Sequence, residues 1–145
     1  MKLIFDLEAD NLLDDASVIW CIVLRDVDTG HVYRYGPDEI QDALSTMRDA
    51  EWLIGHNVLC YDLPVLKKLH DFNYEGRVVD TLVMSRTIYP NLKERDFDRY
   101  QRNPDSLPAK LIGSHSLKAW GIRLGELKGD FNQGEDSFAV YTPEM

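Results

Sequence analysis

The sequence predicts an α/β protein built on one mixed sheet, and three observations carry that prediction. Three strand-like segments come first, at residues 2–7, 17–25 and 31–35, as expected of an antiparallel ribbon. Two shorter apolar segments, at 52–55 and 77–79, then alternate with helix-like segments, which is typical of parallel strands joined by helices. The length of 145 residues suits a single hydrophobic core.

The strands of the ribbon are separated by clear turn signals. Residues 17–25 form a nearly continuous apolar run of strand formers, which predicts a central strand covered on both faces. The Asp-Thr-Gly sequence at 28–30 indicates a turn, and the alternating segment 31–35 is expected to pair with the preceding strand. Gly-Pro at 36–37 then ends the ribbon.

Apolar residues at helical spacing predict four helices. The first runs from 37 to 50, the second from 62 to 72, the third from 80 to 89 and the fourth from 114 or 116 to 124. Residues 90–113 are polar, contain three prolines and show no clear period. We therefore predict a long loop there.

This order of elements resembles that of the ribonuclease H-like fold, an antiparallel three-strand ribbon continued by parallel strands and flanked by helices. We expect that domain to span residues 1–128 and an acidic tail to occupy 129–145. In an open α/β sheet the ligand site lies at the carboxyl ends of the strands.

Composition excludes several classes of protein. Hydrophobic residues make up 44% of the chain and charged residues 28%, which argues against disorder. No run of 18 apolar residues occurs, so no membrane contact is predicted. The first apolar stretch is too short for a signal peptide. Cys21 and Cys60 form no paired motif, which indicates buried free thiols in a cytoplasmic protein.

The net charge of −9 argues against nucleic-acid binding, because phosphate contacts need Lys and Arg. The distribution of charge weakens that exclusion. Residues 86–128 carry nine basic and five acidic side chains, so one basic segment lies within an acidic protein. A solvated basic surface is the alternative interpretation.

Two carboxylates end the first predicted strand. Asp6 and Glu8 are two residues apart, so their side chains point to the same face and Leu7 points to the core. Like charges on one face repel unless a cation lies between them, and Mg²⁺ prefers oxygen ligands. The pair therefore predicts half of a metal site, with a solvated acidic strand end as the alternative.

Asp62 is the second candidate ligand. It begins the predicted helix that follows the strand 52–55, where a simple N-cap is the alternative interpretation. In the proposed fold that strand lies beside the first one. The loop after it is then expected to bring Asp62 toward Asp6.

Several blocks of sequence, in order along nearly the whole chain, resemble the DEDD superfamily of 3′→5′ exonucleases. The similarity is greatest to the proofreading domains of family A DNA polymerases from short-tailed bacteriophages. The blocks are Asp6-x-Glu8, Asn57-x-x-x-Tyr61-Asp62, the segment 80–86 that begins Asp80-Thr81, and the segment 114–129.

The resemblance implies a two-metal exonuclease that uses Mg²⁺ or Mn²⁺ on the 3′ end of single-stranded DNA. Asp6 bridges both metals in that scheme, Glu8 binds the metal that activates the attacking water, and Asp62 reaches the second metal through water. Asp80 supports the site. Expected substrate contacts come from Leu12, Leu13, Asn57, Tyr61 and His115. Core packing is the alternative for the two leucines, and helix capping is the alternative for His115. A polymerase domain is an expected partner, and a phage-encoded protein would work in the bacterial host cytoplasm.

The family's last motif, Tyr-x-x-x-Asp on a final catalytic helix, is absent from the sequence. Stand-ins at Asp130, Glu135 and Asp136 lack a helical context. We therefore expect one metal site to be weakened and activity to be low or absent. Three explanations stay open: a fragment of a longer polymerase, a short protein whose missing carboxylate comes from a partner, and a non-catalytic module that binds a host protein, a replication protein or nucleic acid.

Overall fold

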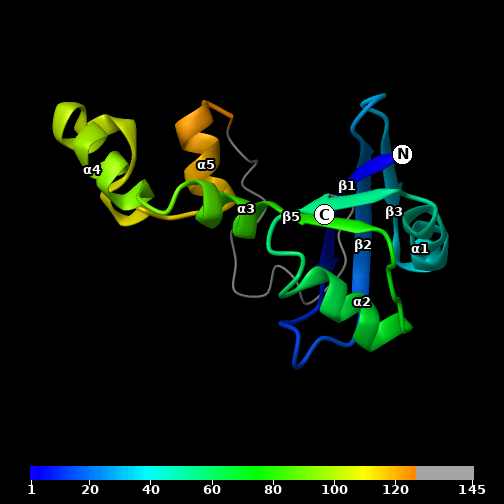
Figure 1. The fold of residues 1–145 in the computed structure, drawn as a ribbon. Helices are drawn as coiled ribbons and strands as arrows, with labels where there is room; N and C mark the ends of the chain where they lie inside the picture. The colour runs from blue at the N-terminus through cyan, green and yellow to red at the C-terminus, as the bar shows by residue number, and fades with distance from the viewer. Residues whose placement is uncertain (127–145) are drawn as a thin grey trace. The chain divides into compact units, whose positions relative to one another are not determined.

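The computed structural model describes residues 1–126 of the chain (Figure 1). These residues divide into two compact units, and the boundary along the chain lies between Thr81 and Leu82. The predicted acidic tail at 129–145 lies outside the described residues.

A five-stranded sheet in the order β3-β2-β1-β4-β5 organises the first unit. Strands β1 (Lys2–Ala9), β2 (Ile19–Asp26) and β3 (Val32–Tyr35) form an antiparallel ribbon. Strands β4 (Trp52–Gly55) and β5 (Arg77–Asp80) continue it in parallel from the β1 edge. The predicted mixed sheet is confirmed, including the pairing of β4 with β1.

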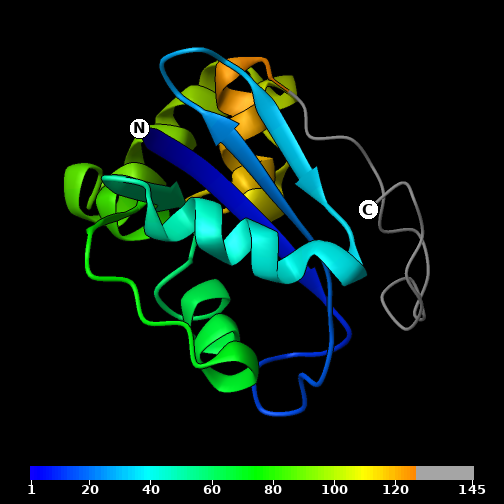
Figure 2. The same ribbon diagram turned by 90° about the vertical axis from the view of Figure 1, so that its right-hand side faces the viewer.

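Helices α1 (Ile40–Arg48) and α2 (Asp62–His70) pack on one face of this sheet. Figure 2 shows α1 lying across the strands. Apolar residues at helical spacing on α1 meet alternate residues of β1 and β2, because side chains on a strand alternate between its faces. The core members on β1 and α1 are Leu3, Phe5, Leu7, Ala9, Ile40, Ala43, Leu44 and Met47.

The two free cysteines differ in exposure. Cys21 on β2 is buried as predicted, whereas Cys60 is exposed and corrects the expectation of two buried thiols. Cys60 follows β4 in the turn that leads into α2, outside the apolar faces of both elements.

The second unit holds most of α3 (Thr81–Ile88), together with α4 (Leu92–Arg102) and α5 (Leu117–Leu124). Short 3₁₀ turns at Pro104–Ser106 and Ala109–Leu111 lie between α4 and α5. The loop predicted over 90–113 is therefore wrong. Eleven of its residues form α4, a helix whose buried positions are Leu92 and the charged Asp96. An apolar period was absent because the buried contact is an ion pair.

The helix predicted from 114 or 116 begins as expected. The Ser116 hydroxyl accepts a hydrogen bond from the Ala119 amide, which satisfies a free donor in the first turn of α5. Within residues 1–126, no helix is long and apolar enough to cross a membrane.

Candidate active site

Asp62 lies at the centre of the carboxylates predicted from the sequence. It is only 3% exposed, although it is the first residue of α2. Tyr61 occupies the N-cap position without a side-chain cap, so the simple capping role considered for Asp62 is wrong. The Leu7 amide instead donates a hydrogen bond to Asp62 Oδ1 at 3.2 Å. Helix α2 is therefore joined directly to the strand that carries Asp6 and Glu8.

Electrostatics show the same proximity. Burial of Asp62 and the negative charge of Asp6, with a smaller effect from Glu8, raise its pKa from 3.8 to about 7. Asp6 is exposed and Glu8 is half-buried, and both point away from the core face that Leu7 joins. The structure thus brings the three predicted carboxylates into one electrostatic neighbourhood at one end of β1.

Asp80 holds the loop that leads into α2. Its carboxylate accepts hydrogen bonds from the amides of Asn57 and Leu59, each at 3.0 Å. Asn57 adopts a left-handed backbone conformation with φ 65°, a geometry that asparagine tolerates better than most residues. Two amides bound to one buried carboxylate fix this turn. These two hydrogen bonds are the means by which Asp80 would support the site, and that role stays a prediction.

Gly55 permits the close approach of this loop to β1. A Cβ atom at Gly55 would lie 2.9 Å from the carbonyl oxygen of Phe5 and 2.2 Å from the Val58 side chain. Any larger residue would therefore push the loop away from the strand.

Leu12 and Leu13 lie on a loop that α2 anchors from the other side. The Lys68 ammonium donates to the carbonyl oxygens of Leu13, Asp14 and Ala16 at 2.9–3.0 Å. The Tyr61 hydroxyl donates to the carbonyl oxygen of Asn11 at 2.7 Å.

The two leucines of this loop have different surroundings. Leu12 is 79% exposed, whereas Leu13 packs against the core. Exposure leaves Leu12 available for contact with a ligand, while the core-packing alternative applies to Leu13.

His115 belongs to the second unit. Its Nδ1 shares a 2.6 Å hydrogen bond with the Ser85 hydroxyl, which also accepts from the indole nitrogen of Trp120 at 2.8 Å. Burial and the positive charges of Arg123 and Arg86 lower the pKa of His115. The predicted stand-ins Asp130, Glu135 and Asp136 lie outside the described residues.

The donor set of Asp6, Glu8 and Asp62 fits a hard divalent cation, because it consists only of carboxylate oxygens. Burial and, after it, the negative charge of Asp6 raise the pKa of Asp62, and a bound cation would favour its charged form. Among residues 1–126 no three Asp, Glu, His or Cys side chains are grouped closely enough to hold an ion as they stand. Binding would therefore have to draw these carboxylates closer together.

Sequence reasoning missed one anchor of the site. Lys68 looks like any lysine on the polar face of a helix, and its three carbonyl partners lie more than 50 positions away. Asp80 was expected to support the site, but the two amides that it binds, more than 20 positions away, carried no signal in the sequence.

The fold of the chain resembles that of a solved α/β protein. The zinc-bound crystal structure of E. coli ExoI with single-stranded DNA matches with a TM-score of 0.61, covering 94% of this chain and 38% of ExoI, at 13% sequence identity. The predicted ribonuclease H-like class is confirmed by this likeness in fold. No family model matches the chain.

Two curated proteins are similar to the chain in sequence. It is 38% identical over 140 residues to the DNA-directed DNA polymerase of Enterobacteria phage T3, and 36% identical over 141 residues to that of Escherichia phage T7. Each match covers 89% of this chain and 20% of the polymerase. The chain is a homologue of one segment of these phage polymerases, as the sequence motifs predicted, and it spans about a fifth of their length.

Proposed function

We propose that this chain is a divalent-metal-dependent 3′→5′ exonuclease of single-stranded DNA, with Asp6, Glu8 and Asp62 as its metal ligands. The observation that carries the proposal is the buried carboxyl of Asp62, held by the Leu7 amide beside Asp6 and Glu8. Homology to phage polymerases and the fold shared with ExoI support the same assignment.

Mg²⁺ or Mn²⁺ bound there would supply an activated water and stabilise the leaving 3′ oxygen. The chain's own residues position these parts. Asp6 and Glu8 project from the part of β1 that pairs with β2, and β4 pairs with the same strand over Lys2–Ile4. Asp62 is fixed by the Leu7 amide, and Asp80 holds the turn that delivers Asp62.

Substrate contacts in this proposal come from the loops beside the carboxylates. Exposed Leu12 is available to pack against the terminal base, and Lys68 and Tyr61 hold its loop in place. Asn57 lies on the opposite loop, in the turn bound by Asp80. His115 belongs to the second unit, and its contact with substrate stays a prediction.

The direct test is release of nucleoside monophosphates from a 3′-labelled oligonucleotide in Mg²⁺ or Mn²⁺. We expect release by the wild type and a loss of about 100-fold or more for Asp6→Asn, because one of the three proposed carboxylate ligands is removed. Asp15→Asn removes the same charge from the exposed loop at 10–17 and is expected to keep full activity. No release by folded protein at high concentration in Mn²⁺ would contradict the proposal and favour a binding module.

A further inference from the structure

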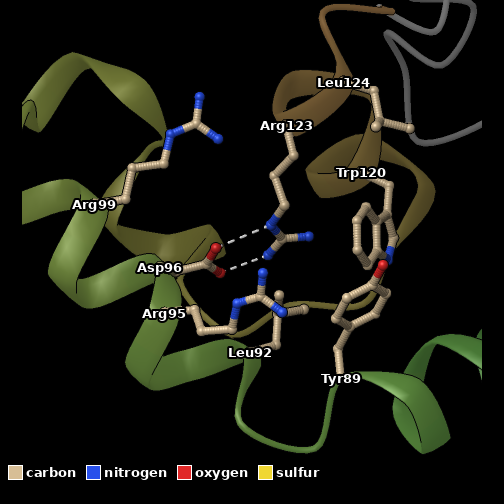
Figure 3. A pocket seen from close by; sticks show the side chains of 8 residues that line it. All are labelled: Tyr89, Leu92, Arg95, Asp96, Arg99, Trp120, Arg123 and Leu124. Carbon is tan, nitrogen blue, oxygen red and sulfur yellow. Dashed lines mark hydrogen bonds and ion pairs between the residues drawn. The ribbon is translucent and has the colours of Figure 1, made fainter.

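The second unit contains a hollow of about 260 Å³ that the proposed active site does not use. Three arginines line it, Arg95, Arg99 and Arg123, together with the rings of Tyr89 and Trp120 (Figure 3). All five residues lie between positions 82 and 126, so the hollow belongs to one unit.

Helical spacing explains how the hollow forms. Arg95 and Arg99 are four residues apart on α4, so they lie one above the other on the same face. Trp120 and Arg123 are three residues apart on α5 and likewise share a face. Both faces line the same hollow, as Figure 3 shows.

Arg123 is locked in place by a buried ion pair. Its Nε donates to Asp96 Oδ1 at 3.0 Å and its Nη2 to Asp96 Oδ2 at 2.6 Å, and the two side chains are 6% and 5% exposed. The Gly113 amide also donates to Asp96 at 2.8 Å. The third nitrogen of Arg123, Nη1, points away from Asp96 in Figure 3 and has no hydrogen-bond partner among residues 1–126.

The hollow carries excess positive charge. Asp96 pairs with Arg123 and also attracts Arg99 at longer range, but within the described part of the chain no carboxylate forms an ion pair with Arg95 or Arg99. Two cations one helical turn apart repel each other. An anion between them would relieve that repulsion, so the arrangement favours a negatively charged ligand.

We propose that this hollow binds a backbone phosphate of single-stranded DNA, an inference that rests on the proposed function for its substrate class. Guanidinium groups match phosphate oxygens with two parallel hydrogen bonds, which an ammonium cannot provide. Arg95 and Arg99 supply the contacts, and the buried Arg123 forms the wall of the hollow.

The same geometry makes the contact independent of base sequence. Arg123 already covers the Trp120 ring at 5.0 Å from its centroid, and Arg95 covers the Tyr89 ring at 5.3 Å. One face of each ring is therefore already covered by a guanidinium, which leaves less aromatic surface for a base to stack on and favours contact through phosphate.

The test measures binding of a 5′-fluorescein oligo(dT) to the full chain by anisotropy, in EDTA and at several salt concentrations. Arg99→Gln is expected to weaken binding about fivefold to tenfold and to reduce the slope of log K against log salt by about 0.7, since one phosphate contact is lost. Arg99→Lys keeps the positive charge but loses the paired hydrogen bonds of the guanidinium group. Its affinity for oligo(dT) is expected to lie between those of Arg99→Gln and the wild type. Oligo(dA) is expected to bind within about threefold of oligo(dT).

Arg102→Gln is the matched control. Arg102 lies on the same helix but does not line the hollow, and its substitution removes the same charge as Arg99→Gln. We therefore expect the affinity for oligo(dT) to change by less than about twofold. Equal losses for Arg99→Gln and Arg102→Gln would overturn the proposal, as would displacement of oligo(dT) by inorganic phosphate at equal phosphate concentration. Because EDTA removes the metals, binding is read without catalysis. Failure here with intact nuclease activity rejects only the hollow, and failure of Asp6-dependent cleavage with intact binding rejects only the nuclease.

Discussion

Asp62 couples the stability of the protein to pH. Its pKa is raised from 3.8 to about 7 in the folded state, so the fold favours the neutral carboxyl. That stabilisation is fully present below the unfolded pKa and is lost as the pH rises through about 7. At pH 8 Asp62 is therefore ionised in the folded protein, at a cost in stability.

Asp62→Asn removes this penalty while keeping an oxygen for the Leu7 amide. We expect the variant to exceed the wild type in free energy of unfolding by about 2–4 kcal/mol at pH 8, and to match it near pH 3.5. Urea unfolding at the two pH values measures the difference. An equal difference at both would contradict the raised pKa, and Asp15→Asn serves as the exposed control.

Divalent cations should offset the same penalty if the proposed site is correct. Mg²⁺ at about 100 times its dissociation constant stabilises a folded protein by about 2.7 kcal/mol. We expect a rise in the Tm of the wild type at pH 8, no rise for Asp6→Asn or Asp62→Asn, and a full rise for Asp15→Asn. Differential scanning calorimetry gives the readout, and a rise shared by all four proteins would place the cation elsewhere.

At the scale of single residues, the sequence predicted which carboxylates lie near one another better than how they are held in place. Strand alternation was enough to place Asp6 and Glu8 on one face, opposite Leu7. The burial of Asp62 was not predictable, because it depends on a hydrogen bond to an amide 55 residues away. Local sequence could not distinguish that arrangement from a helix cap.

At the scale of elements, α2 organises the site from both of its ends. Asp62 at its first turn binds β1, and Lys68 near its last turn binds the loop that follows β1. The three carbonyls bound by Lys68 use all the donors of its ammonium group. Loop and carboxylate are therefore positioned by one rigid helix.

Lys68→Met should release this loop. Loss of three hydrogen bonds from a charged donor is expected to lower the free energy of unfolding by about 1–3 kcal/mol and to speed amide exchange over residues 14–17. Lys67→Met is the neighbouring control. Lys67 pairs with Asp71 on the surface, and its side chain is 53% exposed, so its loss is expected to change stability by less than about 0.5 kcal/mol. Equal effects of the two variants would show that Lys68 is not an anchor.

Helix α4 shows where sequence periodicity fails. Its principal buried polar contact is the pair Asp96–Arg123, whose members are 27 residues apart. Apolar patterns reveal helices that pack through hydrophobic faces. A helix that packs through a charge looks like a loop until its partner is known.

Asp96→Ala should destabilise the second unit, because it leaves the Arg123 guanidinium buried without its carboxylate. We expect a loss of about 3–5 kcal/mol in the unfolding of that unit. The double variant Asp96→Leu with Arg123→Met removes both charges, and recovery of most of this loss is expected. If the double variant is no more stable than Asp96→Ala, the uncompensated charge is not the cause.

At the scale of the whole molecule, the two units differ in charge and in core. Residues 1–81 carry seven basic and 16 acidic side chains, whereas residues 82–126 carry eight basic and five acidic. An acidic unit suits metal ions and a basic one suits phosphates. This division would let a chain of net charge −9 bind DNA as proposed.

The buried apolar core is equally uneven. Its members run from Leu3 to Phe72, all in the first unit, whereas the buried apolar residues described between 82 and 126 are Leu92, Leu107 and Ala119. We expect amides of α4 and α5 to exchange at least about 100-fold faster than those of β1 and β2, because less apolar burial opposes local opening. Hydrogen exchange followed by mass spectrometry tests this, and uniform protection would contradict it.

Because the two thiols differ in exposure, we expect only one of them to react readily with thiol reagents in the native protein. Thiol reagents attack the thiolate, and burial with the nearby charge of Glu8 raises the pKa of Cys21, so that thiol should react slowly. Cys60 is exposed, and it lies in the turn whose amides bind Asp80, immediately before Tyr61 and Asp62. A maleimide dye should therefore attach at one position without mutagenesis. Its emission would report directly on the turn that delivers the central carboxylate as ions and oligonucleotides are added.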